Sequence, residues 1–135
     1  MSPPRPGTSS RRPDERGSVS IELVILLPAL FAVMFLGMQA ALFYHARTVA
    51  IAAAQEGARA AGGEHAQAAD GVTAASGFVA DVGGANVLVA ATATAARSAT
   101  TATVTVHGYS LAVIPGWTPA ITQSASVPIE RVTGP

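Results

Sequence analysis

The 135-residue chain contains no cysteine. Disulfide bonds and thiolate metal sites are therefore excluded, and an oxidising compartment is neither required nor ruled out. Aromatic residues are also scarce, at 5% of the chain, and most of the apolar residues are alanine and valine. Because small side chains bury little area each, we expect a modest core and at most one small soluble domain.

The chain also lacks any concentration of basic charge in its C-terminal part. Eight basic and eight acidic residues give a formal net charge of zero. Beyond residue 46 the arginines are scattered among the acidic residues and form no patch or stripe. Nucleic acid is therefore not an expected partner.

Motifs that carry catalysis or bind cofactors are missing as well. His45, His65 and His107 are far apart and show no metal-binding H-x-x-x-H or H-E-x-x-H spacing. Glu64 and Asp70 flank His65, but their setting is typical of a solvated helix start. The chain has no G-x-S-x-G elbow, Walker loop or dinucleotide fingerprint. The sequence predicts a protein that is not an enzyme, with no catalytic residues, no metal and no cofactor.

What the chain does have is one long apolar run, without formal charge from Leu23 to Ala46 when His45 is counted as neutral. As a helix this run reaches roughly 35 Å, enough to cross a hydrocarbon core of about 30 Å. A helix is the only plausible form for a single span in lipid, where Pro28 is also tolerated. We predict a cationic leader over residues 1–17 and a transmembrane helix over residues 18–46.

The arginines near the two ends of this run predict its orientation. Arg11, Arg12 and Arg16 lie close to its N-terminal end, whereas Arg47 alone lies close to the other end. This bias predicts a single-pass protein of the bacterial cytoplasmic membrane, with a cytoplasmic N-terminus and an extracytoplasmic C-terminal domain. The alternative is a secretory signal peptide, whose apolar region is usually about 7–15 residues, cleaved near Gln39 to Ala41.

The start of the apolar run has the order of a processing site. Gly17 follows an arginine and precedes Ser18, and Glu22 is the carboxylate at the edge of the run. Glycine lets a protease approach the backbone closely, and an ionisable group at the edge of hydrocarbon is by default a functional candidate. In a helix beginning at Ser18, Glu22 lies at i+4 and can neutralise a new amino terminus. Alternatively, Gly17 only starts the helix and Glu22 stays hydrated at the interface.

The stretch R-G-S-V-S-I-E, from Arg16 to Glu22, resembles the junction that type IV prepilin peptidases cut after the glycine. The longer pattern R-G-S-V-S-I-E-L-V-I-L-L-P-A-L-F resembles the start of TadE-like proteins, the minor pilins or pseudopilins of the tight-adherence, Flp-type pilus system. Residues 49–61 are similar to a second segment of that family, with Gln55 where arginine is frequent. The resemblance covers roughly residues 12–63.

The resemblance implies a structural role in pilus assembly and secretion. It implies cleavage between Gly17 and Ser18, recognition and assembly through Glu22, and subunit packing through the helix that follows. The implied partners are the lipid bilayer, a prepilin-type peptidase, an inner-membrane assembly platform and other pilin-like subunits. The alternative, from a different class of protein, is a membrane-anchored or secreted small binding module without catalytic activity.

Beyond the apolar run, the sequence predicts a small α+β domain over residues 64–135. Alanine-rich residues 47–63 continue the first helix outside the membrane, so one helix is expected from Val19 to Ala61, ended by Gly62 and Gly63. This extension could pack against other subunits or act as a stalk. A second helix is expected over residues 64–82, closed by Gly83 and Gly84 and loosely held because of Gly71 and Gly77. Its apolar face comprises Val72, Ala75, Val79 and Val82, with Phe78 beside them.

Three later segments alternate between apolar and polar residues and predict a three-stranded antiparallel sheet with one wet face. They are residues 86–94, 101–109 and 121–129, whose inward residues are Val87, Val89, Ala102, Val104, Val106, Ile121, Ala125, Val127 and Ile129. Such a sheet needs the helices against its apolar side. Trp117, in the loop before the last strand, is expected to pack at the edge of the core or on membrane headgroups.

Overall fold

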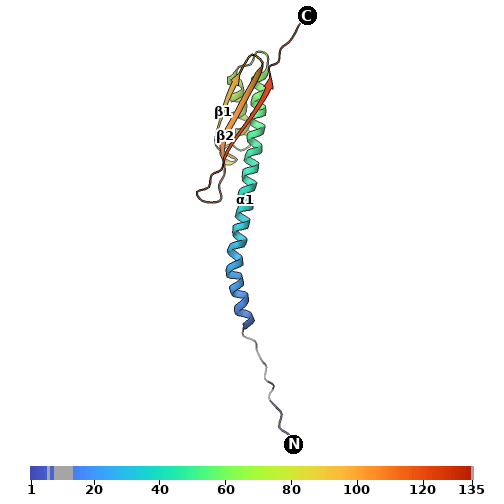
Figure 1. Cartoon of the computed structure of the whole chain (residues 1–135), viewed down its shortest axis with the longest axis vertical. Helices are drawn as coiled ribbons and strands as arrows, with labels where there is room; N and C mark the ends of the chain where they lie inside the picture. The colour runs from blue at the N-terminus through green and yellow to red at the C-terminus, as the bar shows by residue number, and fades with distance from the viewer. Residues whose placement is uncertain (6, 8–13, 135) are drawn as a thin grey trace. The chain divides into compact units, whose positions relative to one another are not determined.

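The computed structural model describes residues 1–5, 7 and 14–134, with the side chains of residues 14–16 left out. The leader residues Arg11 and Arg12, and the side chain of Arg16, lie outside this description. The chain forms two compact units, Met1–Met34 and Phe35–Pro135. The elements confirm the expected α+β class: a long helix, a short helix and a three-stranded antiparallel sheet (Figure 1).

Helix α1 runs from Asp14 to Gly62. It begins earlier than the expected start at Val19, and it ends one residue beyond the expected last helical residue. The last carbonyl groups of a helix have no partner within it. Here the Glu130 N–H donates to the Gly62 carbonyl at 2.9 Å, and Arg97 Nη2 donates to the Gly63 carbonyl at 2.9 Å. The C-terminal end of α1 is thus closed by residues from far along the chain.

The first unit contains the N-terminal part of α1, residues 14–34, and its large apolar side chains are exposed. Those at least half exposed are Val19, Ile21, Leu23, Val24, Ile25, Leu26, Leu30 and Val33. Within the described residues, one helix is long and apolar enough to cross a membrane, and its candidate segment is Gly17–Gly62. This helix is compatible with the membrane anchoring that the sequence predicts.

The second unit contains the sheet, formed by β1 (Leu88–Arg97), β2 (Thr101–Ser110) and β3 (Ala120–Pro128) in the order β1-β2-β3. Both pairings are antiparallel. The first strand begins at Leu88 because Asn86, expected within it, belongs to a 3-10 turn, η1 (Gly84–Asn86). The register of β1 shifts between Val89 and Thr92, where Ala90 has a φ of +50°. This bulge lets the strand continue to Arg97 with its apolar residues on the covered face.

Helix α2 runs from Ala68 to Asp81 and is shorter than expected. Its start is set by the Asp70 carboxylate, which accepts a hydrogen bond from the N–H of the extended residue Gln67 at 2.6 Å. It is followed by Gly83 at a φ of +123°, as the expected glycine stop requires. Its buried face comprises Gly71, Ala75 and Val79, so the expected burial of Ala75 and Val79 is confirmed, whereas Val72 is only half-buried. Val82 was expected on that face and is 38% exposed, because it lies beyond the last turn that covers the sheet.

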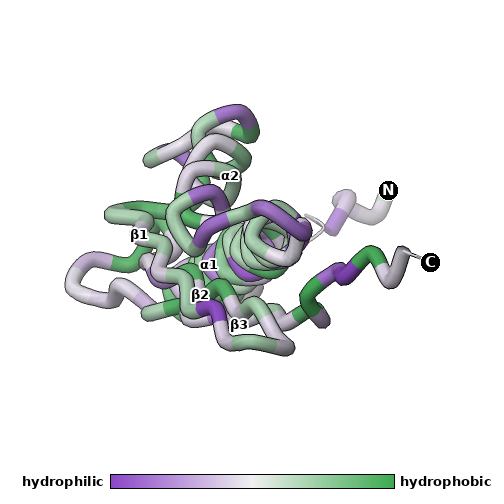
Figure 2. The backbone as a smooth tube through the Cα atoms, turned by 90° about the horizontal axis from the view of Figure 1, so that it is seen from above, coloured by the Kyte–Doolittle hydropathy of each residue, from purple (hydrophilic) through white to green (hydrophobic). Residues whose placement is uncertain are grey.

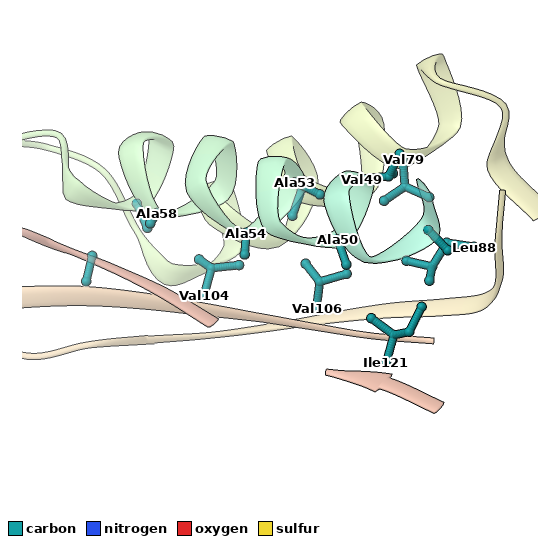
Figure 3. Packing of buried hydrophobic residues seen from close by; sticks show 14 residues of the cluster. Val49, Ala50, Ala53, Ala54, Ala58, Val79, Leu88, Val104, Val106 and Ile121 are labelled. Atoms are coloured by element: carbon teal, nitrogen blue, oxygen red, sulfur yellow. The ribbon is translucent and has the colours of Figure 1, made fainter. Parts of the chain in front are cut away.

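The core lies between the apolar face of the sheet and the two helices (Figures 2 and 3). As expected, Val104 and Val106 of β2 and Ile121 of β3 point inward. The remaining buried residues of the core are mostly alanines of α1. Residues 46–61 therefore form part of the domain core and are not a separate stalk. These buried residues are Ala46, Val49, Ala50, Ala53, Ala54, Ala58 and Ala61, joined by Ala75, Val79, Leu88 and Ala102.

Two glycines allow α1 and α2 to approach each other closely over β2. A Cβ atom at Gly57 would lie 2.7 Å from the Gly71 carbonyl oxygen and 2.8 Å from Val104 Cγ1. A Cβ at Gly71 would lie 2.9 Å from Ala61 Cβ and 2.9 Å from the Gly57 carbonyl oxygen. The expectation that Gly71 marks a loosely held helix is therefore wrong, since this glycine is a point of tight packing.

Candidate functional site

The predicted cleavage pair, Gly17 and Ser18, lies in the first turns of α1. Both residues are exposed, and a Cβ atom at Gly17 would have no neighbour within 4 Å. Gly17 is the fourth residue of the helix, and the first four N–H groups of an α-helix have no intrahelical acceptor. Unwinding this turn would therefore break few hydrogen bonds, and an enzyme that binds an extended chain would require such unwinding.

Glu22 lies one helical turn beyond Ser18 and is exposed. The two residues are separated by i+4, so their side chains lie on the same face of the helix. Ion pairs between described residues join Arg59 to Glu56 and Glu64 to His65, and neither involves Glu22. A carboxylate in this position can form an ion pair with an amino terminus at residue 18.

A stripe of large apolar residues follows Glu22 along α1. Leu23, Leu26, Leu27, Leu30 and Val33, with Ala29, line a shallow groove on the first unit. Their spacing of three and four residues places them on one face of the helix. Its large side chains are exposed, so the stripe is compatible with contact with lipid or with another helix.

A second cluster, centred on Gln39, was missed from the sequence. Gln39 is 1% exposed, although it lies within the apolar run. Its Nε2 donates to the Leu111 carbonyl at 3.0 Å and to Ser110 Oγ at 3.4 Å, while its Oε1 accepts from the Val113 N–H at 2.9 Å. The signal that could have found it is a lone uncharged amide among apolar residues, since a buried amide requires hydrogen-bond partners.

Beside Gln39 lies an apolar groove of about 420 Å³, formed by α1 and the loop between β2 and β3. Its lining residues, apart from Gln39, are Leu36, Ala40, Phe43, Tyr44, Trp117 and Pro119. Trp117 is 49% exposed and Tyr44 63% exposed, so the tryptophan lies over the edge of the domain instead of filling its core. We call residues 111–119 the β2–β3 loop and this hollow the loop groove.

The outer face of the sheet is lined by hydroxyl groups paired across β2 and β3. Thr103 Oγ1 lies 2.7 Å from Ser126 Oγ, and His107 Nδ1 lies 2.8 Å from Thr122 Oγ1. The contact with Thr122 gives the His107 ring a hydrogen-bond partner within the sheet. His45 and His65 are exposed and lie outside the sheet. The part of the chain that the structure describes contains no group of three or more His, Cys, Asp or Glu residues able to hold a metal ion.

Part of the chain is similar to a known protein family. Neither the curated proteins nor the solved structures contain a match to this chain. The family model described as TadE-like protein matches residues 17–59, less than half of the chain. The match begins at the predicted cleavage glycine and extends into the alanine-rich part of α1 that packs on the sheet. The resemblance drawn from the sequence is confirmed over residues 17–59, where the chain is similar to the TadE-like family, a family of pilus-associated structural components.

Proposed function

We propose that this chain is a single-pass membrane subunit of minor-pilin or pseudopilin type that acts in the assembly of a Flp-type pilus. It is inserted with its N-terminus in the cytoplasm and cut between Gly17 and Ser18 by a prepilin-type peptidase. Glu22 then neutralises the new amino terminus, and the apolar stripe of α1 packs against other pilin-like subunits. The assembly platform in the inner membrane is the implied partner for this step.

The observation that carries the proposal is the coincidence of three features at one end of α1. The family match begins at Gly17, Glu22 is the fifth residue after the proposed cut, and the large side chains of the next turns are exposed. Exposed residues of this size are unusual in a water-soluble helix, where a contiguous apolar patch marks an interaction surface. Membrane insertion followed by subunit packing uses this surface in both stages.

The rival function is an anchored or secreted binding module without processing after Gly17. After a signal peptidase cut near Gln39 to Ala41, the mature chain would begin within the segment of α1 that belongs to the compact second unit. The new chain would lose or displace the amide that holds Leu111 and Val113. This cost to the domain favours the subunit function over the secreted module.

Mass spectrometry of the chain expressed with and without a prepilin-type peptidase separates the functions. The proposal expects a mature chain that starts at Ser18 only when the peptidase is present, and Gly17→Val should block this cut. A start at Met1 or Ser2 in both cases would support the plain anchor. A start near residue 40 would support the secreted module.

The role of Glu22 is tested by Glu22→Gln, which keeps the size of the side chain and removes its charge. We expect surface pili to be lost or strongly reduced in a pilus-forming host, whereas the chain still inserts in the membrane. Glu56→Gln is the matched control, because Glu56 is an exposed glutamate of the same helix whose ion pair contributes at most about 1 kcal/mol. Normal piliation of the Glu22→Gln strain would refute the assembly role.

A further inference from the structure

The part of α1 that belongs to the first unit is too short to cross a bilayer by itself, so a membrane span must include residues of α1 that belong to the second unit. Residues 18–34 span roughly 25 Å at 1.5 Å per residue, against a hydrocarbon core of about 30 Å. A span of about 20 residues ends near Gly37 if it starts at Ser18, and near Leu42 if it starts at Leu23, after the carboxylate of Glu22. The outer edge of the hydrocarbon therefore falls within residues 37–42, which belong to the second unit.

Gln39 lies in the middle of this interval. Its side chain binds the β2–β3 loop, which therefore lies beside this turn of α1. Its amide is joined to the backbone of Leu111 and Val113 by hydrogen bonds of 3.0 and 2.9 Å. Within the bilayer an unpaired amide would cost several kcal/mol, on the order of the penalty for any unsatisfied polar group in lipid. The same hydrogen bonds that satisfy Gln39 bring the β2–β3 loop to the edge of the hydrocarbon.

The β2–β3 loop has the composition of a membrane-interface segment. No charged residue occurs from Gly108 to Ile129. Its tip is a tight turn, in which the Trp117 N–H donates to the Ile114 carbonyl at 3.2 Å and Gly116 has a φ of +77°. The exposed rings of Trp117 and Tyr44 flank the loop groove. Tryptophan and tyrosine with a polar tip and an apolar body are the residues enriched at the headgroup level of membranes.

We propose that the β2–β3 loop is a second membrane contact, which rests on the outer leaflet with Trp117 and Tyr44 at headgroup depth and the loop groove filled by lipid acyl chain. The inference rests on the membrane insertion stated in the proposed function and adds a lipid-binding role to the folded domain. Lipid is favoured over a protein partner because the groove carries no charged side chain, and its α1 residues belong to the uncharged run from Leu23 to Ala46. Before pilus assembly, this contact would hold the domain against the membrane surface.

Trp117 is the only tryptophan of the chain, so its fluorescence reports on the loop alone. The full-length protein is placed in nanodiscs of phosphatidylethanolamine and phosphatidylglycerol, with nitroxide-labelled phospholipid added. We expect strong quenching by a nitroxide near the headgroup, weaker quenching by a nitroxide near the end of the acyl chain, and protection from aqueous iodide. Free access of iodide without quenching by either lipid label would overturn the inference.

Two further outcomes distinguish a lipid contact from burial against a second copy and from a failure of membrane insertion. Protection from iodide that requires two copies per nanodisc, without lipid quenching, would assign the groove to a second copy and refute the lipid contact. A chain that does not associate with nanodiscs at all would refute membrane insertion itself, and the loop contact with it. Lipid association without quenching refutes the loop contact only.

Two variants locate the contact in the residues named. Gln39→Leu keeps the helix apolar but removes the hydrogen bonds to the loop, so most of the headgroup quenching of Trp117 should be lost. Gln55→Leu is the matched control, because Gln55 is an exposed glutamine of the same helix, and quenching should be unchanged.

Thr118→Glu tests the same contact without disturbing the hydrogen bonds, since Thr118 is exposed in the loop. A carboxylate there is repelled by the anionic phosphatidylglycerol surface, and we expect quenching to fall. Thr94→Glu, on the exposed side of β1, should leave it unchanged. Full quenching in both Gln39→Leu and Thr118→Glu would overturn the assignment.

Discussion

Helix α1 changes character between its two halves. In residues 14–34 the large side chains, such as Leu23, Ile25 and Phe31, are exposed, whereas in residues 46–61 alanine and glycine are buried against the sheet and α2. Residues 23–34 carry no charge, whereas the second stretch has charged residues such as Arg47, Glu56 and Arg59 on its exposed side. The two stretches also differ in the size of their apolar side chains, because large residues suit contact with lipid or another subunit, and small ones allow secondary-structure elements to approach closely.

The contrast between the halves also indicates where the second unit obtains its stability. Burial of apolar surface stabilises the fold by about 25 cal/mol per Å². Because an alanine buries little apolar area, each alanine contributes little to the free energy of folding. Close packing of many such residues is needed, with a few larger side chains such as Leu88 and Val104 at the centre. A change that separates the layers should therefore affect the domain strongly, whereas the first unit should tolerate changes in size.

The largest expected effect comes from placing a carboxylate in each half of the helix. Ala54→Asp would bury an unpaired charge under the sheet and should destabilise the domain by at least about 4 kcal/mol. Leu27→Asp should leave the folding of the domain unchanged and impair membrane insertion, at a cost of about 3 kcal/mol near the centre of a span. Denaturation followed by Trp117 fluorescence and membrane fractionation measure the two effects. Equal effects on folding would abolish the distinction between the halves.

The next effect tests the few large residues of the core. Leu88→Ala should lower the free energy of unfolding of the domain by about 2–5 kcal/mol, because the cavity left between α2 and the sheet cannot close fully. Val132→Ala is the control, since Val132 is 74% exposed in the C-terminal tail and should be nearly neutral. Chemical denaturation curves of both variants decide this. A loss no greater than that of the control would mean that Leu88 is not central to the core.

A smaller effect tests the close approach of the two helices. Gly57→Ala should destabilise the domain by about 1–3 kcal/mol, because its Cβ has no room between Gly71 and Val104. Gly77→Ala should instead stabilise α2 by up to about 1 kcal/mol, since a Cβ there meets nothing within 4 Å and alanine is the better helix former. Thermal unfolding of the pair provides the measurement. Stabilisation by both substitutions would show that the helices are not tightly packed at Gly57.

The smallest effect concerns the bulge in β1. Ala90 has a φ of +50°, a conformation that costs an L-residue roughly 1–2 kcal/mol and glycine almost nothing. Ala90→Gly should therefore raise the unfolding midpoint slightly, whereas Ala91→Gly, at the next position, should lower it. Differential scanning calorimetry of the two variants compares their unfolding midpoints directly. A lower midpoint for Ala90→Gly would argue against the bulge.

Local features of the fold were predictable from the sequence because they depend on neighbours along the chain. The period of two in residues 101–109 places Val104 and Val106 inside, as the structure confirms. The glycine pairs after each helix end it close to the expected positions. The start of α2 was predicted too early because the hydrogen bond from Gln67 to Asp70, and not apolar periodicity, decides it.

The candidate site divides along the same line. The order of Gly17, Ser18 and Glu22 before an apolar helix is a property of adjacent residues, so the sequence alone determined the processing hypothesis and the TadE-like resemblance that the family match confirms. Only the tertiary structure decided that Gln39 binds Leu111 and Val113 and that Gly57 faces Gly71. These contacts join segments far apart in the sequence, and no local pattern encodes them. They form only when the sheet packs on both helices, because this packing brings Gln39 to the β2–β3 loop and Gly57 to Gly71.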